Sequence, residues 1–254
     1  MPSSAAPVAG GSCLLVAEVG VAFMLLVVFA AMFTQGLVGF GSAMVSMALL
    51  PEPLGLSVAG PLVALMALPS EGLVLIRYRR SLNWRAVARL AAGMVVGVPV
   101  GILALRHLDE RLLLVVLGGA IAAYALYGLL ELRLPALRRP QWAYVFGWLA
   151  GVLGGAYNTS GPPVVIYGTG RQWSREEFKG NLQAFFLLCD LSVVLGHVLA
   201  GTLTREVGRL FLLALPVILL GSAMGLVLDR FIPPVLFRRL VLVLLLVLGL
   251  RLLL

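Results

Sequence analysis

The chain has few charged residues and little cysteine for its length. Of its 254 residues, 12% are charged and 61% are hydrophobic, and the mean hydropathy is +1.06. Soluble domains are typically ~25% charged and ~45–50% apolar, so this composition excludes a water-soluble fold. The two cysteines, Cys13 and Cys189, lie far apart in apolar stretches, which argues against a disulfide framework or a cysteine-ligated metal site. The chain is therefore predicted to be an integral membrane protein.

Motifs for catalysis are also scarce. The two histidines, His107 and His197, belong to no His-Glu-x-x-His motif, and the glycines at 36–41 are not followed by the Gly-Lys-Ser/Thr of a nucleotide-binding loop. We therefore expect no enzyme activity, no ATP-driven pumping, no metal and no cofactor. Arginine supplies 18 of the 19 basic residues, in short clusters between apolar runs. This pattern is typical of loops at a membrane surface and not of a nucleic-acid-binding stripe.

Apolar stretches follow one another along the whole chain. About 20 such residues are enough to cross the hydrocarbon of a bilayer as a helix. The pattern therefore predicts an all-α polytopic membrane protein. The predicted segments are, approximately, 14–33, 36–50, 56–76, 86–105, 112–130, 142–170, 180–200, 208–228 and 234–254.

Two of the apolar runs are interrupted by glycine-rich polar sequence away from their ends. The run 14–50 is interrupted at Thr34-Gln35-Gly36 and again at Gly39-Phe40-Gly41-Ser42, and the run 142–170 is interrupted at 154–163. Backbone without helical hydrogen bonds is tolerated at membrane depth only where it lines a cavity or is buried in protein. The interruptions therefore predict a cavity. The alternative is that the glycines only allow close packing and a kink.

The residues at each interruption are suited to start a half-helix. Ser160 is a good N-cap, and Pro162 fits the first turn because it has no amide hydrogen to leave unpaired. The free amides and positive dipole ends of two such half-helices would face the interruptions and favour a small anion. We therefore expect the substrate-binding residues to be Gly39, Gly41, Ser42, Asn158, Thr159, Ser160, Gly161 and Pro162.

The two halves of the chain match when one is shifted by 120 to 124 residues. Gly41 then falls on Gly161, and Gly60 falls on Gly180. Such an internal duplication is common in secondary transporters. Each repeat would contain about four helical segments, of which the first is broken. The predicted division is a first repeat at 1–130, a polar linker at 131–141 and a second repeat at 142–254.

The distribution of basic residues favours inverted repeats. If 142–170 enters the bilayer and returns to the same side, the cytoplasmic side holds 14 lysines and arginines and the outside 5. If it crosses, the counts are 11 and 8. The positive-inside rule favours the first arrangement, and by symmetry 14–50 would also be a hairpin. Arg171 and Lys179 would then lie in a cytoplasmic loop. The loops expected to face the cytoplasm are 77–89, 131–141, 171–179 and 230–239.

Two carboxyl groups lie within apolar runs. Asp190 has aromatic and aliphatic neighbours on both sides, and Glu71 lies near the equivalent position of the first half. A charge at the bilayer centre costs roughly 2.5–3.5 kcal/mol on insertion scales, so each should face a cavity or a partner, or be protonated. A structural hydrogen bond is the alternative for both, as is an interfacial position near Arg77 for Glu71. The predicted coupling or pathway residues are Asp190, Glu71, Gln35, Asn181 and Gln183, with interhelical hydrogen bonding as the alternative for the last two.

Two motifs at the interruptions are more specific than the rest. They are Gly-Leu-Val-Gly-Phe-Gly-Ser at 36–42 and Tyr-Asn-Thr-Ser-Gly-Pro-Pro-Val-Val-Ile-Tyr at 157–167. With them the sequence resembles the TauE/SafE family of sulfite exporters over nearly the whole chain. It departs from the common pattern in having Gly39-Phe40-Gly41 in place of a run of glycines and Lys179 in place of arginine. The resemblance implies a multi-pass protein of the bacterial inner membrane that transports sulfite or an organosulfonate.

These features together predict secondary transport of a small sulfur oxyanion, inorganic or organic, across the lipid bilayer, with protons as a candidate coupling ion. A passive anion channel is the alternative; its flux would be insensitive to a proton gradient. The repeats Gly93-x3-Gly97-x3-Gly101 and Gly221-x3-Gly225 predict close helix packing within the subunit. A homodimer seam is the less favoured reading of these glycines.

Overall fold

The computed structural model describes residues 9–107, 109–130, 137 and 139–229, together with residues 231, 235, 239, 242–243, 246–247, 249–250 and 253. All regular structure in this part of the chain is helical, and it contains no strand. The prediction of an all-α fold is therefore confirmed. The predicted segment 234–254 and the predicted linker 131–141 lie largely outside the described residues.

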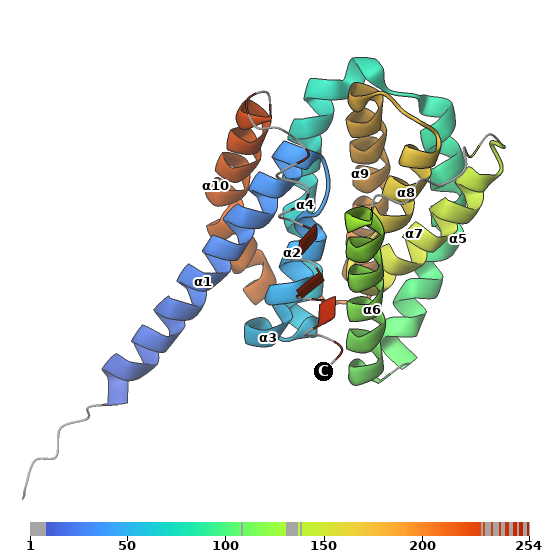
Figure 1. Cartoon of the computed structure of the whole chain (residues 1–254). Helices are drawn as coiled ribbons and strands as arrows, with labels where there is room; N and C mark the ends of the chain where they lie inside the picture. The colour runs from blue at the N-terminus through green and yellow to red at the C-terminus, as the bar shows by residue number, and fades with distance from the viewer. Residues whose placement is uncertain are drawn as a thin grey trace, which may run out of the picture.

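Ten α-helices and one short 3-10 helix make up the described part of the chain (Figure 1). In chain order they are α1 (Ala9–Val38), α2 (Ser42–Leu49), α3 (Pro51–Leu54), α4 (Leu56–Tyr78), the 3-10 helix η1 (Arg79–Ser81), α5 (Trp84–His107), α6 (Glu110–Leu129), α7 (Trp142–Tyr157), α8 (Gly161–Gly170), α9 (Arg175–Leu199) and α10 (Arg205–Leu228). α9 begins five residues before the predicted start, because its first turn is polar. Ser174 caps that turn by accepting a hydrogen bond from the N–H of Glu177.

Five helical stretches among the described residues are long and apolar enough to cross a membrane. By contrast, α7 has 16 residues and α8 has 10, fewer than the ~20 that a span requires. The chain is therefore a multi-pass membrane protein, and α7 and α8 are each shorter than a typical span. The five candidate spans are Gly20–Val38, Leu56–Ser81, Trp84–Ala104, Arg175–Leu199 and Arg205–Leu228.

Each interrupted run contains a break in the helix. Residues 39–41 separate α1 from α2, and residues 158–160 separate α7 from α8. The predicted interruption at Thr34-Gln35-Gly36 is wrong, because these residues continue α1. The Thr34 hydroxyl donates back to the Ala30 carbonyl, and Gly36 lies against the backbone of α10 where a side chain would collide. Neither residue therefore disturbs the helix, and only the second glycine cluster ends it.

α7 and α8 form an antiparallel hairpin that returns to the end of the molecule from which it enters. At its open end the N–H of Leu137 donates to the Gly170 carbonyl, and Arg171 Nη1 donates to the Leu137 carbonyl, both at 2.9 Å. Phe146 of α7 packs on Tyr167 of α8 with ring centroids 5.8 Å apart. Figure 1 shows the start of α7 and the end of α8 at the same end. This is the arrangement that the count of basic residues favours.

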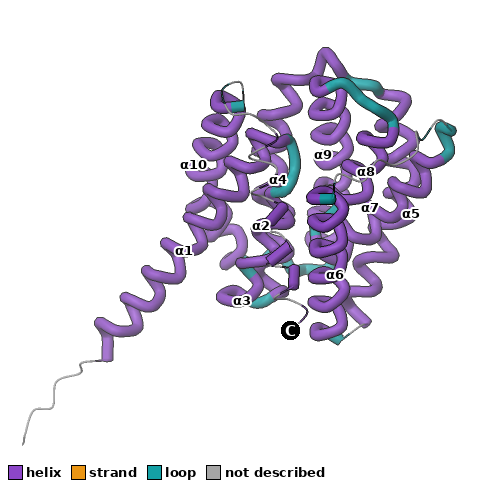
Figure 2. The backbone as a smooth tube through the Cα atoms, viewed as in Figure 1, coloured by secondary structure: helices purple, strands orange, loops and turns teal. Residues whose placement is uncertain are grey.

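Most of the described basic loops gather at one end of the molecule. We call it the basic end and define it by residues 77–85, 139–141 and 171–175. Asn83, before α5, donates through Nδ2 to Glu177 Oε1 of α9 at 3.1 Å. Figure 2 shows the loops before α5 and before α9 together at the upper end of the view. Loops 77–89, 131–141 and 171–179 are expected to lie on one face, and their described parts lie together at the basic end. The fourth loop, 230–239, lies largely outside the described residues.

Glycine-lined contacts hold each broken helix against a helix from the other half of the chain. Along α5, Gly93, Gly97 and Gly101 face the backbone of α7, and α1 meets α10 in the same way through Gly36 and Gly225. A Cβ atom at any of these five positions would collide with backbone atoms of the facing helix. Small residues of this kind let helices approach closely in membranes. The prediction that the glycine repeats pack within the subunit is confirmed.

We call the glycine-lined contacts between α5 and α7 and between α1 and α10 the glycine seams. The central helices α4 and α9 lie between these two seams. They pack on each other, and each also contacts one seam, α4 through α10 and α9 through α5. Leu62 and Met66 of α4 and Phe185 of α9 are fully buried in the core. Glu71 and Asp190 each lie within one helical turn, ~3.6 residues, of the middle of their span. The fold thus places one carboxyl group near the middle of each central helix.

Candidate functional site

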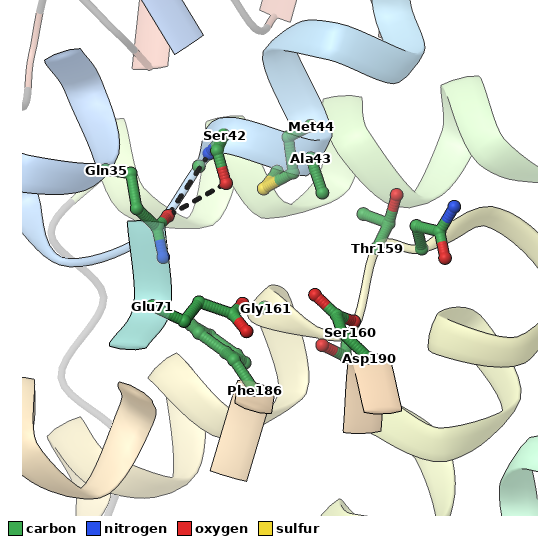
Figure 3. A pocket seen from close by; sticks show the side chains of 12 residues that line it. Gln35, Ser42, Ala43, Met44, Glu71, Thr159, Ser160, Gly161, Phe186 and Asp190 are labelled. Atoms are coloured by element: carbon green, nitrogen blue, oxygen red, sulfur yellow. Dashed lines mark hydrogen bonds between the residues drawn. The ribbon is translucent and has the colours of Figure 1, made fainter. Parts of the chain in front are cut away.

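A cavity lies where the two breaks meet the central helices (Figure 3). Its walls come from the end of α1, the first turn of α2, the break after α7, the start of α8, and the sides of α4 and α9. Both halves of the chain therefore contribute to one polar cavity. The lining residues are Gln35, Gly41, Ser42, Ala43, Met44, Glu71, Asn158, Thr159, Ser160, Gly161, Phe186 and Asp190.

The cavity is small. The space within it that the centre of a water-sized sphere can occupy is about 20 Å³. By the same measure a single water molecule needs roughly 10–15 Å³. The structure is therefore contracted around the site, which has room for little more than a water molecule.

The first break requires glycine at two positions. Gly39 has φ 91° and Gly41 has φ 105°, both in the left-handed region that favours glycine. Gly41 is the N-cap of α2, and Ser42 donates to Gln35 Oε1 from its hydroxyl at 3.0 Å and from its N–H at 3.4 Å (Figure 3). The Gln35 side chain therefore ties the end of α1 to the start of α2 and fixes the Ser42 hydroxyl in the cavity wall.

Side chains of α9 hold the first break from the other half of the chain. Gln183 Nε2 donates to the Gly39 carbonyl at 2.6 Å, and Gln183 Oε1 accepts from Gln35 Nε2 at 3.1 Å. One turn earlier, Lys179 Nζ donates to the Leu37 carbonyl at 2.8 Å. The last carbonyls of a helix lack helical partners, so these donors satisfy groups that the break leaves open. The break is thus supported by tertiary contacts and is more than a kink.

The second break uses asparagine in place of glycine. Asn158 ends α7 with φ 54°, a left-handed conformation that asparagine adopts more readily than most residues. Its Nδ2 donates to the Gly60 carbonyl of α4 at 2.5 Å, whereas its Oδ1 is buried without a hydrogen-bond partner. The Thr159 hydroxyl donates to the Tyr157 carbonyl at 3.0 Å. One neutral hydrogen bond therefore links this break to the other half of the chain.

The first turn of α8 has fewer free amides than the sequence suggests. Ser160 occupies the N-cap position but makes no capping hydrogen bond, which corrects the prediction. A capping side chain accepts from the N–H of the second or third helical residue. In α8 these residues are Pro162 and Pro163, which have no N–H. Gly161 therefore supplies the one amide of this turn.

The first turn of α2 supplies the amide donors that α8 lacks. Its first helical hydrogen bond runs from the N–H of Val45 to the Gly41 carbonyl. The N–H groups of Ala43 and Met44, both in the cavity wall, therefore have no acceptor within the helix. Since a helix N-terminus also carries a partial positive charge, α2 presents the side of the cavity more favourable to an anion.

The two carboxyl groups of the central helices meet in this cavity. Glu71 is 2% exposed and Asp190 is 3% exposed, and the two carboxyl groups lie close enough to interact within the cavity. Figure 3 shows Glu71 entering from one side and Asp190, next to Ser160, from the other. Glu71 Oε2 and Asp190 Oδ1 have no hydrogen-bond partner. Since ionised carboxylates only accept, a hydrogen bond between two carboxyl groups requires a proton on one of them.

A charged group of four residues, here called the Asp229 cluster, lies at the basic end. Asp229, after α10, accepts from Lys179 at 2.8 Å, from Arg175 at 2.5 Å and from the Tyr78 hydroxyl at 3.0 Å. Burial raises the pKa of Asp229, but hydrogen bonds from Lys179, Tyr78 and Arg175 outweigh burial, so this pKa lies below its usual value. The cluster joins the ends of α4, α9 and α10, and Lys179 connects it to the first break.

Comparison with known proteins agrees with this architecture. The family model described as sulfite exporter TauE/SafE matches residues 24–252. The chain belongs to the TauE/SafE family. It is 30% identical over 195 residues to the probable inner membrane transporter protein TsaS of Comamonas testosteroni, which covers 76% of this chain and 82% of that protein. It is 29% identical over 213 residues to the probable sulfite/organosulfonate exporter TauE of Cupriavidus necator, which covers 80% of each chain. No solved structure gives a significant match.

Membership of the TauE/SafE family confirms the resemblance stated from the motifs. It also confirms a transporter of the bacterial inner membrane, in agreement with the five apolar spans among the described residues. The match covers both breaks and both central helices.

The TauE/SafE fold brings together most of the residues singled out from the sequence. Glu71 lies in the interior and not at the interface near Arg77. The predicted residues that line the cavity are Gln35, Gly41, Ser42, Glu71, Asn158, Thr159, Ser160, Gly161 and Asp190.

Four of the predicted residues do not line the cavity. Gln183 donates to the Gly39 carbonyl at the first break, and this bond supports the cavity wall without lining it. Asn181 lies nearer the basic end, where its Oδ1 accepts from the N–H of Asn83 at 2.7 Å. Pro162 is a buried residue of α8, and its effect is to remove an amide from the first turn. Gln183 bonds to Gln35 of α1, which is the alternative of hydrogen bonding between helices, whereas Asn181 bonds to the loop before α5.

Sequence reasoning missed the Asp229 cluster. The expectation that Lys179 lies in a loop is wrong, because it belongs to α9 and is 3% exposed. A signal was present, since Lys179 is the single lysine of a chain that otherwise uses arginine. Asp229 gave no signal, because a charged residue at the end of an apolar run is ordinary.

Proposed function

We propose that this chain is a secondary transporter of a small sulfur oxyanion, either sulfite or an organosulfonate. Family membership and the name of the relative from Cupriavidus necator support this substrate class. The observation that carries the proposal is the cavity between the two breaks, to which both halves of the chain contribute near the middle of the central helices. A site shared by two halves at mid-depth is what alternating access requires.

The anion is proposed to bind between α2 and the second break. The amides of Ala43, Met44 and Gly161 and the hydroxyls of Ser42 and Ser160 are its candidate donors. Ser42 donates to Gln35 in the contracted structure, and rotation about its Cα–Cβ bond would redirect the hydroxyl into the cavity. An oxyanion accepts several hydrogen bonds at once, and bonds to a charged acceptor are the stronger ones.

Residues 1–130 and 142–254 are proposed to act as inverted repeats. Each broken helix packs through a glycine seam on the other half, α7 on α5 and α1 on α10. The α7–α8 hairpin opens at the basic end, whereas Figure 1 shows α1 entering from the opposite end and α3 lying there. Rocking of one seam against the other would expose the cavity to the two sides in turn.

Protons are the proposed coupling ion, carried by Asp190 together with Glu71. An anion that left a cell with a negative interior alone would be driven outward by about 2.3 kcal/mol per charge per 100 mV, so export by itself would not require a coupled ion. Import works against that potential, and a proton bound in the cavity cancels one substrate charge. The same site therefore permits either direction, and the gradients present determine the net flux.

Counterflow in proteoliposomes tests the proposal. We expect preloaded sulfite to drive uptake of labelled sulfite, with stronger competition from short organosulfonates than from carboxylates. Glu71→Gln combined with Asp190→Asn should abolish flux driven by a pH gradient while leaving counterflow largely intact, because the neutral amides mimic the protonated pair. Asp109→Asn, at an exposed helix cap, is the matched control. Flux without counterflow would support a passive channel, and failure to bind sulfite, sulfate, thiosulfate or any sulfonate would contradict the substrate class.

A further inference from the structure

The cavity presents an electrostatic problem for a transporter of anions. The described residues that line it include two carboxyl groups, Glu71 and Asp190, and no positively charged side chain. Both carboxyl groups are more than nine-tenths buried, so water screens neither of them. An oxyanion that entered beside two ionised carboxylates would be repelled with little screening.

Among the described residues, no neighbouring element supplies the missing positive charge. Lys179 and Arg175 of α9 are committed to Asp229 at the basic end. On the far side of α4, Ser222 of α10 donates to Ser70. The groups that face the pair from α1, α2, the second break and α9 itself are neutral or acidic: Gln35, Ser42, Asn158, Thr159, Ser160 and the thiol of Cys189.

Unpartnered oxygen atoms surround the point where the two carboxyl groups meet. Glu71 Oε2 and Asp190 Oδ1 are buried without a hydrogen-bond partner, and both residues line the same small cavity. Independently, Asn158 is 5% exposed, lines the same cavity, and has a buried Oδ1 without a partner. Buried acceptors of this kind are costly unless a donor reaches them. Around the two carboxyl groups the geometry therefore provides acceptors for protons, whereas the free amide donors lie at the first turn of α2.

We infer that Glu71 and Asp190 act as one proton-binding pair, which shares one proton in the contracted structure and takes up a second when the anion binds. The inference rests on the proposed function, since it requires an anion in this cavity. With two protons the pair is neutral, so the repulsion disappears. A carboxyl O–H outside the mutual hydrogen bond then becomes a donor for an oxyanion oxygen.

The second proton also supplies a free hydrogen-bond donor, because the polar side chains of the cavity already use theirs. The Ser42 hydroxyl, the Thr159 hydroxyl and Asn158 Nδ2 already donate to groups of the protein. Protonated carboxyl groups add donors without breaking these bonds. One proton enters with each singly charged anion and leaves with it, so the loaded cavity carries the charge of the empty one. The empty pair keeps its shared proton throughout.

Calorimetric titration of the purified chain with ethanesulfonate tests this stoichiometry. Ethanesulfonate keeps one negative charge across the working pH range, so a change in affinity with pH arises in the protein. Titrations in two buffers of different ionisation enthalpy should report uptake of about one proton per anion. Apparent affinity should fall about tenfold per unit rise in pH once the free pair has lost its second proton, as linkage of one proton requires. This measurement needs no variant and is independent of variant folding.

Two single variants and the double variant test whether Glu71 and Asp190 bind the proton together or one of them binds it alone. Proton uptake on binding of ethanesulfonate is measured for each variant. If the pair is the unit, Glu71→Gln and Asp190→Asn each still take up a proton through the remaining carboxyl group, at a changed pH. The double variant should bind ethanesulfonate with an affinity independent of pH. Glu206→Gln, which neutralises an exposed carboxylate at the start of α10, is the control and should match the parent chain. Loss of proton uptake on Asp190→Asn alone, with Glu71→Gln unchanged, overturns the pair.

The outcomes also distinguish this inference from the proposed function. Binding of ethanesulfonate without proton uptake contradicts the pair and leaves the anion site standing. Affinity that depends on Na⁺ at fixed pH, and not on pH, overturns the assignment of the proton. Absence of binding by both ethanesulfonate and sulfite at every pH contradicts the proposed function itself.

Discussion

The two breaks both border the cavity but are built from different residues. The first break uses two glycines with positive φ, Gly39 and Gly41, whereas the second uses Asn158. The first break receives charged and polar donors from α9, while the second donates one neutral hydrogen bond to the Gly60 carbonyl of α4. A similar path of the backbone is therefore reached by two sets of contacts, and the first break is the more firmly held.

The difference between the breaks extends to what each offers an anion. The first turn of α2 has amides at Ala43 and Met44, whereas α8 begins with Gly161 followed by two prolines. A helix N-terminus binds anions through its free N–H groups, so its capacity depends on which residues fill the first turn. α2 therefore contributes most of the backbone donors, and the second break contributes side chains.

The largest expected effect comes from the part of the structure that the two breaks share. Gly97→Val places a side chain against the backbone of α7, and Gly225→Val does the same against α1. Forcing atoms into a packed interior costs ~1–3 kcal/mol or more, so both variants should lose monodisperse folded protein in size-exclusion chromatography and in thermal unfolding. Gly119→Val is the control, because nothing lies within 4 Å of its Cβ position. Full stability of one seam variant would show that the seams are not equivalent.

An intermediate effect should distinguish the two breaks directly. Lys179→Met leaves the buried Leu37 carbonyl without its donor and removes one partner of Asp229, so the free energy of unfolding should fall by ~1–3 kcal/mol. Asn158→Gly keeps the backbone conformation and loses one neutral hydrogen bond, with an expected cost of ~0.5–1.5 kcal/mol. Thermal unfolding in detergent compares the two, with Arg205→Met at the exposed start of α10 as control. Equal losses would mean that the Asp229 cluster does not strengthen the first break.

The smallest effect is a dependence of stability on pH at the basic end. The pKa of Asp229 in the folded chain lies below its ordinary value of ~3.9, because its hydrogen bonds outweigh burial. Its stabilising contribution is therefore complete above the unfolded pKa and is lost as the pH falls through the folded pKa.

The difference in melting temperature between the parent chain and Asp229→Asn should therefore be constant at neutral pH and should shrink below about pH 4. Arg175 is half exposed, so solvent screening keeps this effect modest. A difference that stays constant into the acid range would show that the carboxylate contributes no pH-dependent stability.

Local patterns were sufficient where a residue interrupts an apolar run. Polar and glycine-rich sequence in the middle of such a run is costly in lipid, so the positions of Gly41, Ser42 and 158–161 in a cavity could be predicted. The same reasoning failed at Thr34-Gln35-Gly36, which the sequence alone does not distinguish from a break. The Thr34 hydroxyl bonds within its own helix, and Gly36 packs against α10, so the helix continues.

Composition and hydropathy by themselves determined the class of this protein, since a chain with so little charge is stable only in lipid, and its motifs identified the family. Tertiary structure alone decided which polar side chains share a cavity. It joined Glu71 to Asp190, directed Gln183 to the first break and Asn181 toward the basic end, and paired Lys179 with Asp229. The physical reason is that each of these contacts forms between helices far apart in sequence. A helix directs its neighbouring residues to different sides, so a position in the sequence does not reveal its partner.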